Sequence, residues 1–90
     1  MPLVFFAPHL RHHVDFLPQQ VAGDTVAEAL EAAFAIAPRL RSYVLDDQGR
    51  LRQHVFVFVN GRRVLDREAL ARTRVDGEDE VQVFQALTGG

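Results

Sequence analysis

One strongly periodic stretch, residues 24–38 (DTVAEALEAAFAIAP), limits what this 90-residue chain can fold into. Apolar side chains recur in it every three or four residues, which predicts a helix with one apolar stripe. Thr25 and Glu28 have the spacing of a capping box at its start. Asp24 adds negative charge at the same end, and Pro38 stops the helix. Because one such helix can cover only one face of a sheet, the other face is expected to stay bare.

Short apolar runs on both sides of this helix predict strands, since proline, glycine or acidic turns bound them. Pro18 confines the second run to an edge position, and Asn60-Gly61 is a strong hairpin signal. The order of strand, strand, helix and three further strands indicates an α+β domain. The expected strands cover residues 3–8, 16–23, 52–59, 62–66 and 81–87.

Two segments between these strands are less regular. Residues 39–45 predict a short helical turn with Leu40 and Val44 facing inward. Residues 67–75 predict an irregular or single-turn segment. Residues 46–49 and 76–80 have turn composition, and solvated charge is the expected role of their carboxylates. Paired carboxylates also occur in acid/base catalysis, and the second acidic turn could steer the arginines of a partner.

Composition narrows the functional classes. Hydrophobic residues make up 48% and charged residues 24% of the chain, as in a globular domain. A net charge of -2 gives no electrostatic case for nucleic acid or an anionic membrane. No signal peptide or membrane span is expected, and the lack of cysteine excludes a cysteine nucleophile and suits the cytoplasm. All ten basic residues are arginine, so the chain offers no lysine as an isopeptide acceptor.

Alternation along the strands assigns side chains to the two faces of the sheet. In the last strand two valines alternate with Gln82 and Phe84, and because glutamine prefers water, Phe84 is predicted to be exposed. The valines of residues 55–59 and Phe5 are assigned to the helix side. The bare face is then expected to carry Phe6, Phe56, Phe58 and Phe84, with Arg63 at its edge.

An exposed aromatic cluster of this kind is typical of a contact surface. The alternative is that the strand faces are reversed and that these phenylalanines belong to the core. Short apolar runs are compatible with either assignment.

The motifs "DT", "VNG" and "DGEDEV" and the terminal "GG", in this order, resemble those of the ubiquitin-like β-grasp sulfur carriers over essentially the whole chain. These carriers include the small subunit of molybdopterin synthase and the carriers of thiamin and cysteine biosynthesis. The resemblance implies a β-grasp domain at residues 1–87, with a mixed sheet of four to five strands and one main helix on one face. It also implies a flexible tail at residues 88–90.

The resemblance further implies a non-enzymatic role in which the carboxyl group of Gly90 reacts. A ubiquitin-activating-type enzyme adenylates this carboxyl with ATP and magnesium, a sulfur donor converts it to a thiocarboxylate, and a synthase uses the sulfur. The chain itself binds no cofactor. Gly89 supplies a second small, flexible residue next to Gly90. Residues 87–90 would span about 14 Å when extended, enough to thread a channel. The positions that match the docking face of these carriers are Phe6, Phe58, Arg63, Phe84 and Leu87.

Several alternatives stay open at this point. The chain could be a ubiquitin-like modifier or binding module joined to targets through Gly90, although the absence of lysine favours the carrier. It could also be a β-grasp domain with an incidental pair of glycines. The length of residues 39–53 favours a molybdopterin-type or cysteine-type carrier, but the pathway and the oligomeric state are left open. The histidines of HLRHH (His9, His12 and His13) are interpreted as a solvated loop, so no metal site is expected.

Overall fold

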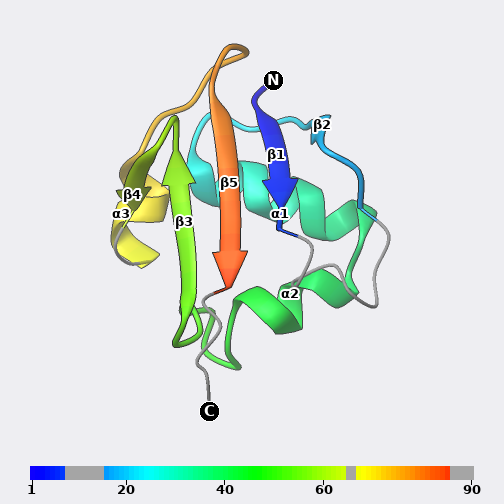
Figure 1. Ribbon diagram of the computed structural model, residues 1–90, viewed down its shortest axis with the longest axis vertical. Coiled ribbons are helices and arrows are strands. Elements are labelled where there is room, and N and C mark those ends of the chain that lie inside the picture. Colours follow the sequence, from blue (N-terminus) through cyan, green and yellow to red (C-terminus); the bar gives the residue numbers. More distant parts are fainter. Residues whose placement is uncertain (8–15, 65–66, 86–90) are drawn as a thin grey trace.

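The computed structural model describes residues 1–7, 16–64 and 67–85 (Figure 1). In chain order the elements are β1 (Leu3–Phe6), β2 (Gln19–Gln20), α1 (Val26–Ile36), α2 (Arg39–Val44), β3 (Val55–Val59), β4 (Arg62–Val64), α3 (Arg67–Arg72) and β5 (Glu80–Gln85). The expected α+β order is confirmed, although β1, β2 and β3 are shorter than expected. Residues 67–72, within the stretch for which the sequence predicts an irregular or single-turn segment, form a helix.

The strands form one mixed sheet in the order β2-β1-β5-β3-β4. The parallel pair β1 and β5 lies inside the sheet, and the other neighbouring pairs are antiparallel. Strand β2 has two residues and lies at one edge, as Pro18 predicts. Figure 1 shows α1 crossing one face of the sheet, with β5 running between β1 and β3. The first and last strands of the chain therefore lie side by side.

Helix α1 begins with the expected cap. The Thr25 hydroxyl oxygen accepts a hydrogen bond from the Glu28 backbone N–H at 3.2 Å. Glu28 Oε1 accepts in turn from the backbone N–H of Asp24 at 2.8 Å. The first bond satisfies a donor that the first turn of a helix leaves unpaired, and the second binds the residue before the cap to the same turn.

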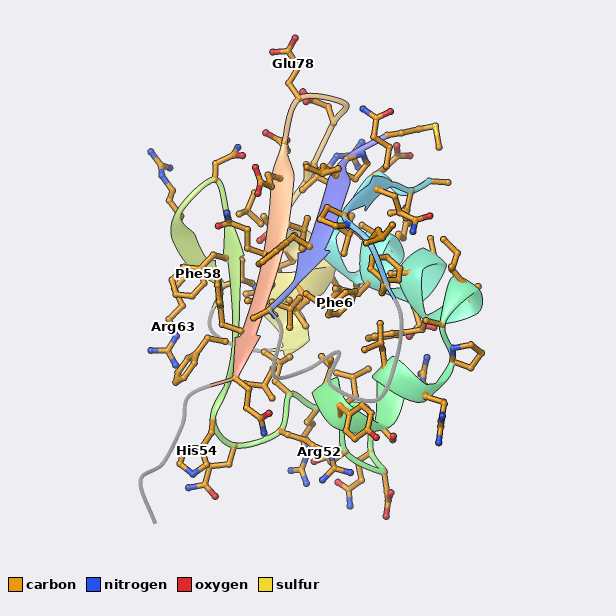
Figure 2. The ribbon with its side chains drawn as sticks, turned by 45° about the vertical axis from the view of Figure 1, so that its right-hand side comes forward. Phe6, Arg52, His54, Phe58, Arg63 and Glu78 are labelled. Atoms are coloured by element: carbon orange, nitrogen blue, oxygen red, sulfur yellow. The ribbon has the colours of Figure 1, made fainter. Side chains whose placement is uncertain are left out.

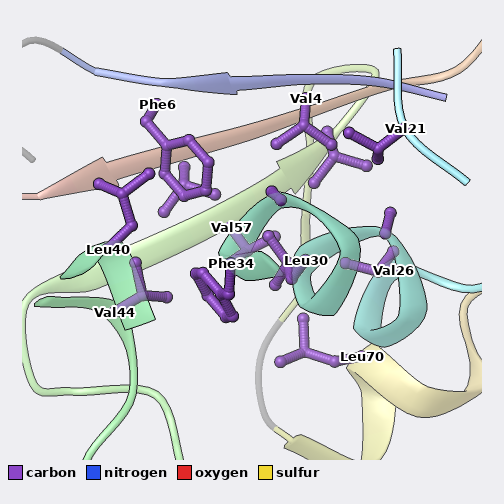
Figure 3. Packing of buried hydrophobic residues seen from close by; sticks show 14 of the residues in the cluster. Val4, Phe6, Val21, Val26, Leu30, Phe34, Leu40, Val44, Val57 and Leu70 are labelled. Carbon is purple, nitrogen blue, oxygen red and sulfur yellow. The ribbon is translucent and has the colours of Figure 1, made fainter. Parts of the chain in front are cut away.

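The core lies between the sheet and the helices (Figure 3). Val26, Leu30 and Phe34 of α1 point into it, and Leu40 and Val44 of α2 are completely buried, as predicted. Because the helices cover only one face of the sheet, side chains on the other face are expected to be polar or partly exposed.

Phe6 belongs to this core, which corrects its expected place on the bare face. Its side chain is 1% exposed, and its ring packs edge-on against Phe16 with the centroids 5.0 Å apart. Strand β1 pairs in parallel with β5, and Phe6 lies beside Val83 in the register. Since Val83 faces the helices, Phe6 faces them too, and Phe5 takes the bare face instead.

The Asn60-Gly61 turn joins β3 to β4 as predicted. Both residues have positive φ, 52° and 85°, as a tight hairpin of this type requires. Asn60 Nδ2 donates to Asp79 Oδ1 at 2.7 Å, and Asn60 Oδ1 accepts from the Glu80 backbone N–H at 2.9 Å. The turn is thereby tied to the start of β5, 19 residues further along the chain from Asn60 to Asp79.

These contacts make stability depend on pH. The hydrogen bond from Asn60, followed by that from the Asp76 backbone N–H, lowers the pKa of Asp79 below its ordinary value of 3.8. A carboxyl group with a lowered folded-state pKa adds stability above its unfolded pKa and loses it as pH falls through the folded value. We expect Asp79→Asn, which mimics the protonated acid, to be less stable than the parent protein at neutral pH. The difference should shrink in strong acid.

Urea unfolding followed by circular dichroism at neutral and acidic pH measures this difference. Asp47→Asn is the matched control, because Asp47 is an exposed carboxylate in the other acidic turn. If the free energy of unfolding of Asp79→Asn stayed below that of the parent by a constant amount across the acid range, the assigned role of the ionised carboxylate would be contradicted.

Candidate partner-binding face

The sheet surface opposite the helices carries an aromatic cluster, which we call the aromatic face. The pairing register of β3 and β5 decides which side chains lie on this face. Phe84 lies opposite Phe56 on it, and the neighbouring pair Val57 and Val83 is buried on the helix side. Figure 2 shows Arg63 near Phe58, and these two residues pair across the β3–β4 hairpin. The aromatic face consists of Phe5, Phe56, Phe58, Phe84 and Arg63.

Ring contacts connect this face into one surface. The centroid of Phe84 lies 5.9 Å from that of Phe5 and 5.7 Å from that of Phe58, with tilted and edge-on rings. The Arg63 guanidinium carbon lies 4.5 Å from the centroid of the Phe56 ring. Aromatic pairs and cation–π contacts at these separations are favourable. All four rings are partly buried by their neighbours and partly open to solvent.

The structure places three of the predicted docking residues, Phe58, Phe84 and Arg63, on this face. Phe6 does not belong to it, and Phe5, which the sequence analysis assigned to the helix side, does. The docking role of all these residues stays a prediction. Leu87, Gly89 and Gly90 lie outside the described residues.

The aromatic face adjoins the end of the last strand. Gln85, the final residue of β5, pairs with Val55 at the start of β3. Phe84, the residue before it, contacts two other rings of the face. Strand β5 therefore ends next to the aromatic cluster, so a protein that contacts the face also lies close to Gln85.

One carboxylate in each of the two acidic turns, Asp46 and Asp79, has structural partners. Asp46 Oδ1 accepts backbone N–H bonds from Gln48 and Arg50 at 2.8 and 3.0 Å, and Asp79 binds Asn60 and Asp76. Both segments contain turns, as predicted, but Asp46 and Asp79 hold the turns through hydrogen bonds and are not solvated charges only. Within residues 1–7, 16–64 and 67–85, no three potential ligands gather as a metal site would need. The histidines His9, His12 and His13 lie outside the described residues.

No helix in the described ranges has the length and apolar character needed to cross a bilayer.

Comparison with known proteins agrees with this architecture. The mixed sheet and its crossing helix define a ubiquitin-like β-grasp protein of the α+β class, as expected. The chain belongs to the ThiS family, which matches residues 10–90.

Small archaeal modifier protein 1 of Haloferax volcanii is a relative, with 38% identity over 71 residues that cover 78% of this chain and 76% of the relative. A crystal structure of that modifier superposes with a TM-score of 0.76 at 30% identity, covering 98% of this chain and 97% of that one. A chain of the Amycolatopsis orientalis BexX/CysO complex superposes with a TM-score of 0.70 and full coverage of both chains. At 22% identity, this last likeness shows the fold alone.

The family and these relatives assign the chain to the small ubiquitin-like modifiers and sulfur-carrier-type proteins, which are not catalytic enzymes. In such a protein the aromatic face can supply binding energy and orientation. It supplies no acid, base or nucleophile, because its side chains are phenylalanines and one arginine.

Proposed function

We propose that this chain is a sulfur carrier whose Gly90 carboxyl group is adenylated and then converted to a thiocarboxylate. The observation that carries the proposal is the ThiS-family match, which extends through the Gly89-Gly90 pair beyond the end of β5. Glycine has no Cβ, so the backbone of these two residues can approach a nucleotide and an enzyme channel closely.

The proposed chemistry has two steps. The Gly90 carboxylate attacks the α-phosphate of ATP, held with magnesium by a ubiquitin-activating-type enzyme, and releases pyrophosphate. A sulfur donor at the oxidation level of sulfide then attacks the acyl carbon, and AMP leaves with the electron pair of the broken C–O bond. The thiocarboxylate passes its sulfur to a downstream synthase in the cytoplasm, in a molybdopterin-type or cysteine-type pathway.

Adenylation is tested by isotope exchange between pyrophosphate and ATP, with the ubiquitin-activating-type enzyme of the same host. We expect exchange that requires this chain and saturates with its concentration. Exchange that is unchanged when the chain is omitted would contradict the proposal.

The aromatic face is proposed to dock the activating enzyme. Phe84 lies at its centre, in contact with both Phe5 and Phe58. We expect Phe84→Arg to weaken the complex by about 2 kcal/mol or more, roughly thirtyfold in Kd, as central aromatic residues of interfaces do. Calorimetric titration with the activating enzyme measures the loss.

Ile36→Arg is the matched control, because Ile36 is an apolar residue of α1 that is 53% exposed and lies away from the aromatic face. It should leave binding unchanged. Both variants should keep the melting temperature of the parent within a few degrees, since Ile36 is exposed and Phe84 lies on the partly exposed sheet face outside the core. Equal losses of affinity in both variants would argue against docking through this face.

A second candidate function is conjugation to other proteins through Gly90. The 38% identity to a small archaeal modifier protein favours it, and both functions share the acyl-adenylate. Purification from the native host separates them. A free chain whose mass shows the exchange of one oxygen for sulfur supports the carrier, whereas isopeptide links from Gly90 to lysines of other proteins support the modifier.

A further inference from the structure

A second surface lies beside the hairpin, on the other side of β4 from the aromatic face. It is an open groove of about 710 Å³ between the β3–β4 hairpin and α3, which we call the β4 groove. Figure 1 shows β4 and α3 next to each other at the edge of the sheet. The lining includes Arg62, Arg63, Thr73, Arg74 and Asp79.

The charge of the β4 groove is positive. Its three arginines are exposed, and no ion pair in the described part of the chain engages them. The carboxylate of Asp79 is already bound on both oxygens, by the Asn60 amide and by the Asp76 backbone N–H. Among the described residues, the groove therefore presents guanidinium groups without an ion-pair partner, in a chain whose net charge is -2.

The arginines do not converge on one point. Arg62 pairs with Val59 and shares the helix side with it, whereas Arg63 pairs with Phe58 and lies over Phe56 on the aromatic face. Charges on opposite faces of one strand cannot hold a single phosphate group. They match a ligand that runs along the strand and offers side chains to both faces.

Strand β4 is suited to such a ligand because it ends the sheet. Its only neighbour among the described strands is β3, so no described strand pairs with its other side. An added strand brings backbone hydrogen bonds, and its alternating side chains reach the two faces in turn.

We propose that the β4 groove binds an extended acidic segment of a partner protein. The backbone of the segment pairs along β4. Its carboxylates meet Arg62 and Arg74 on the helix side and Arg63 on the aromatic side. The groove shares Arg63 with the aromatic face but takes no part in the Gly90 chemistry, and it goes beyond the proposed function because it selects partners by a short acidic strand.

The test uses amide NMR spectra of the isotope-labelled full chain, titrated with an acetylated peptide in which glutamate alternates with valine. Shifts are expected at residues 62–64 and 69–74, and they should weaken as salt is added. Arg62→Glu/Arg74→Glu should weaken binding about tenfold or more, because two attractions become repulsions. Arg62→Gln/Arg74→Gln should give an intermediate loss and guards against misfolding of the reversed variant.

Arg39→Glu/Arg41→Glu on α2 makes the same change in net charge outside the groove and should bind within about twofold of the parent. Equal losses in this control would show unspecific attraction and overturn the proposal. A lack of shifts at the β4 groove would also overturn it. So would tighter binding of inorganic phosphate or AMP to the same residues, because the groove would then be an anion site. The titration contains no activating enzyme, so its failure leaves the sulfur-carrier proposal untouched.

Discussion

Gly90→Val is expected to abolish adenylation while leaving the folded domain intact. A β-branched side chain at the reacting residue adds bulk beside the carboxyl group, where the proposed enzyme channel has room for glycine only. Because the sequence predicts a flexible tail at residues 88–90, the free energy of unfolding should stay within about 0.5 kcal/mol of the parent.

Pyrophosphate exchange and thermal unfolding, measured on the same preparation, check both parts of this expectation. Thr88→Ala is the control, because it removes bulk from the same segment and should retain exchange. Extension of the chain by one residue after Gly90 should also abolish activity, since it moves the carboxyl group. Full activity of Gly90→Val would remove the reason for a glycine at the reacting position.

Phe6→Ala is expected to cost about 3–5 kcal/mol of stability, as the loss of a fully buried phenylalanine does. The ring is 1% exposed and packs against Phe16, with Phe34 at a centroid distance of 6.3 Å. A loss of this size is a large share of the stability of a small domain.

The neighbouring Phe5→Ala is the matched comparison, because Phe5 is half-exposed on the aromatic face. It should cost at most about 2 kcal/mol, since only part of its apolar surface is buried. Urea unfolding of the two variants gives both values. A larger loss of stability for Phe5→Ala than for Phe6→Ala would mean that Phe5, not Phe6, faces the core.

Local signals predicted much of the fold. The capping pair Thr25 and Glu28 and the helical spacing after it placed α1, and Asn60-Gly61 placed the hairpin. These features depend on neighbours in the sequence, so they can be recognised without tertiary contacts.

The errors concern elements whose structure depends on distant partners. Residues 3–6 contain no polar side chain, so only the parallel pairing with β5 decides which phenylalanine is buried. Helix α3 has six residues, too few to be stable alone, and the buried Leu70 anchors it against the core.

In the candidate site too, features set by neighbouring residues could be predicted and features set by distant residues could not. Gln82 identified the solvent side of β5, and this led to Phe58, Phe84 and Arg63. The β4 groove could not be predicted, because Arg62 and Arg74 are separated in the sequence and only the folded chain brings them to one surface.

The central claim is that Gly90 carries sulfur, and the mass of the C-terminal peptide tests it most directly. The chain would be incubated with its activating enzyme, ATP, magnesium and a sulfide donor, digested, and analysed by mass spectrometry. The account predicts that one oxygen of the Gly90 carboxyl group is replaced by sulfur and that the change requires ATP. A C-terminal peptide that keeps both oxygens, although pyrophosphate exchange shows active adenylation, would contradict it.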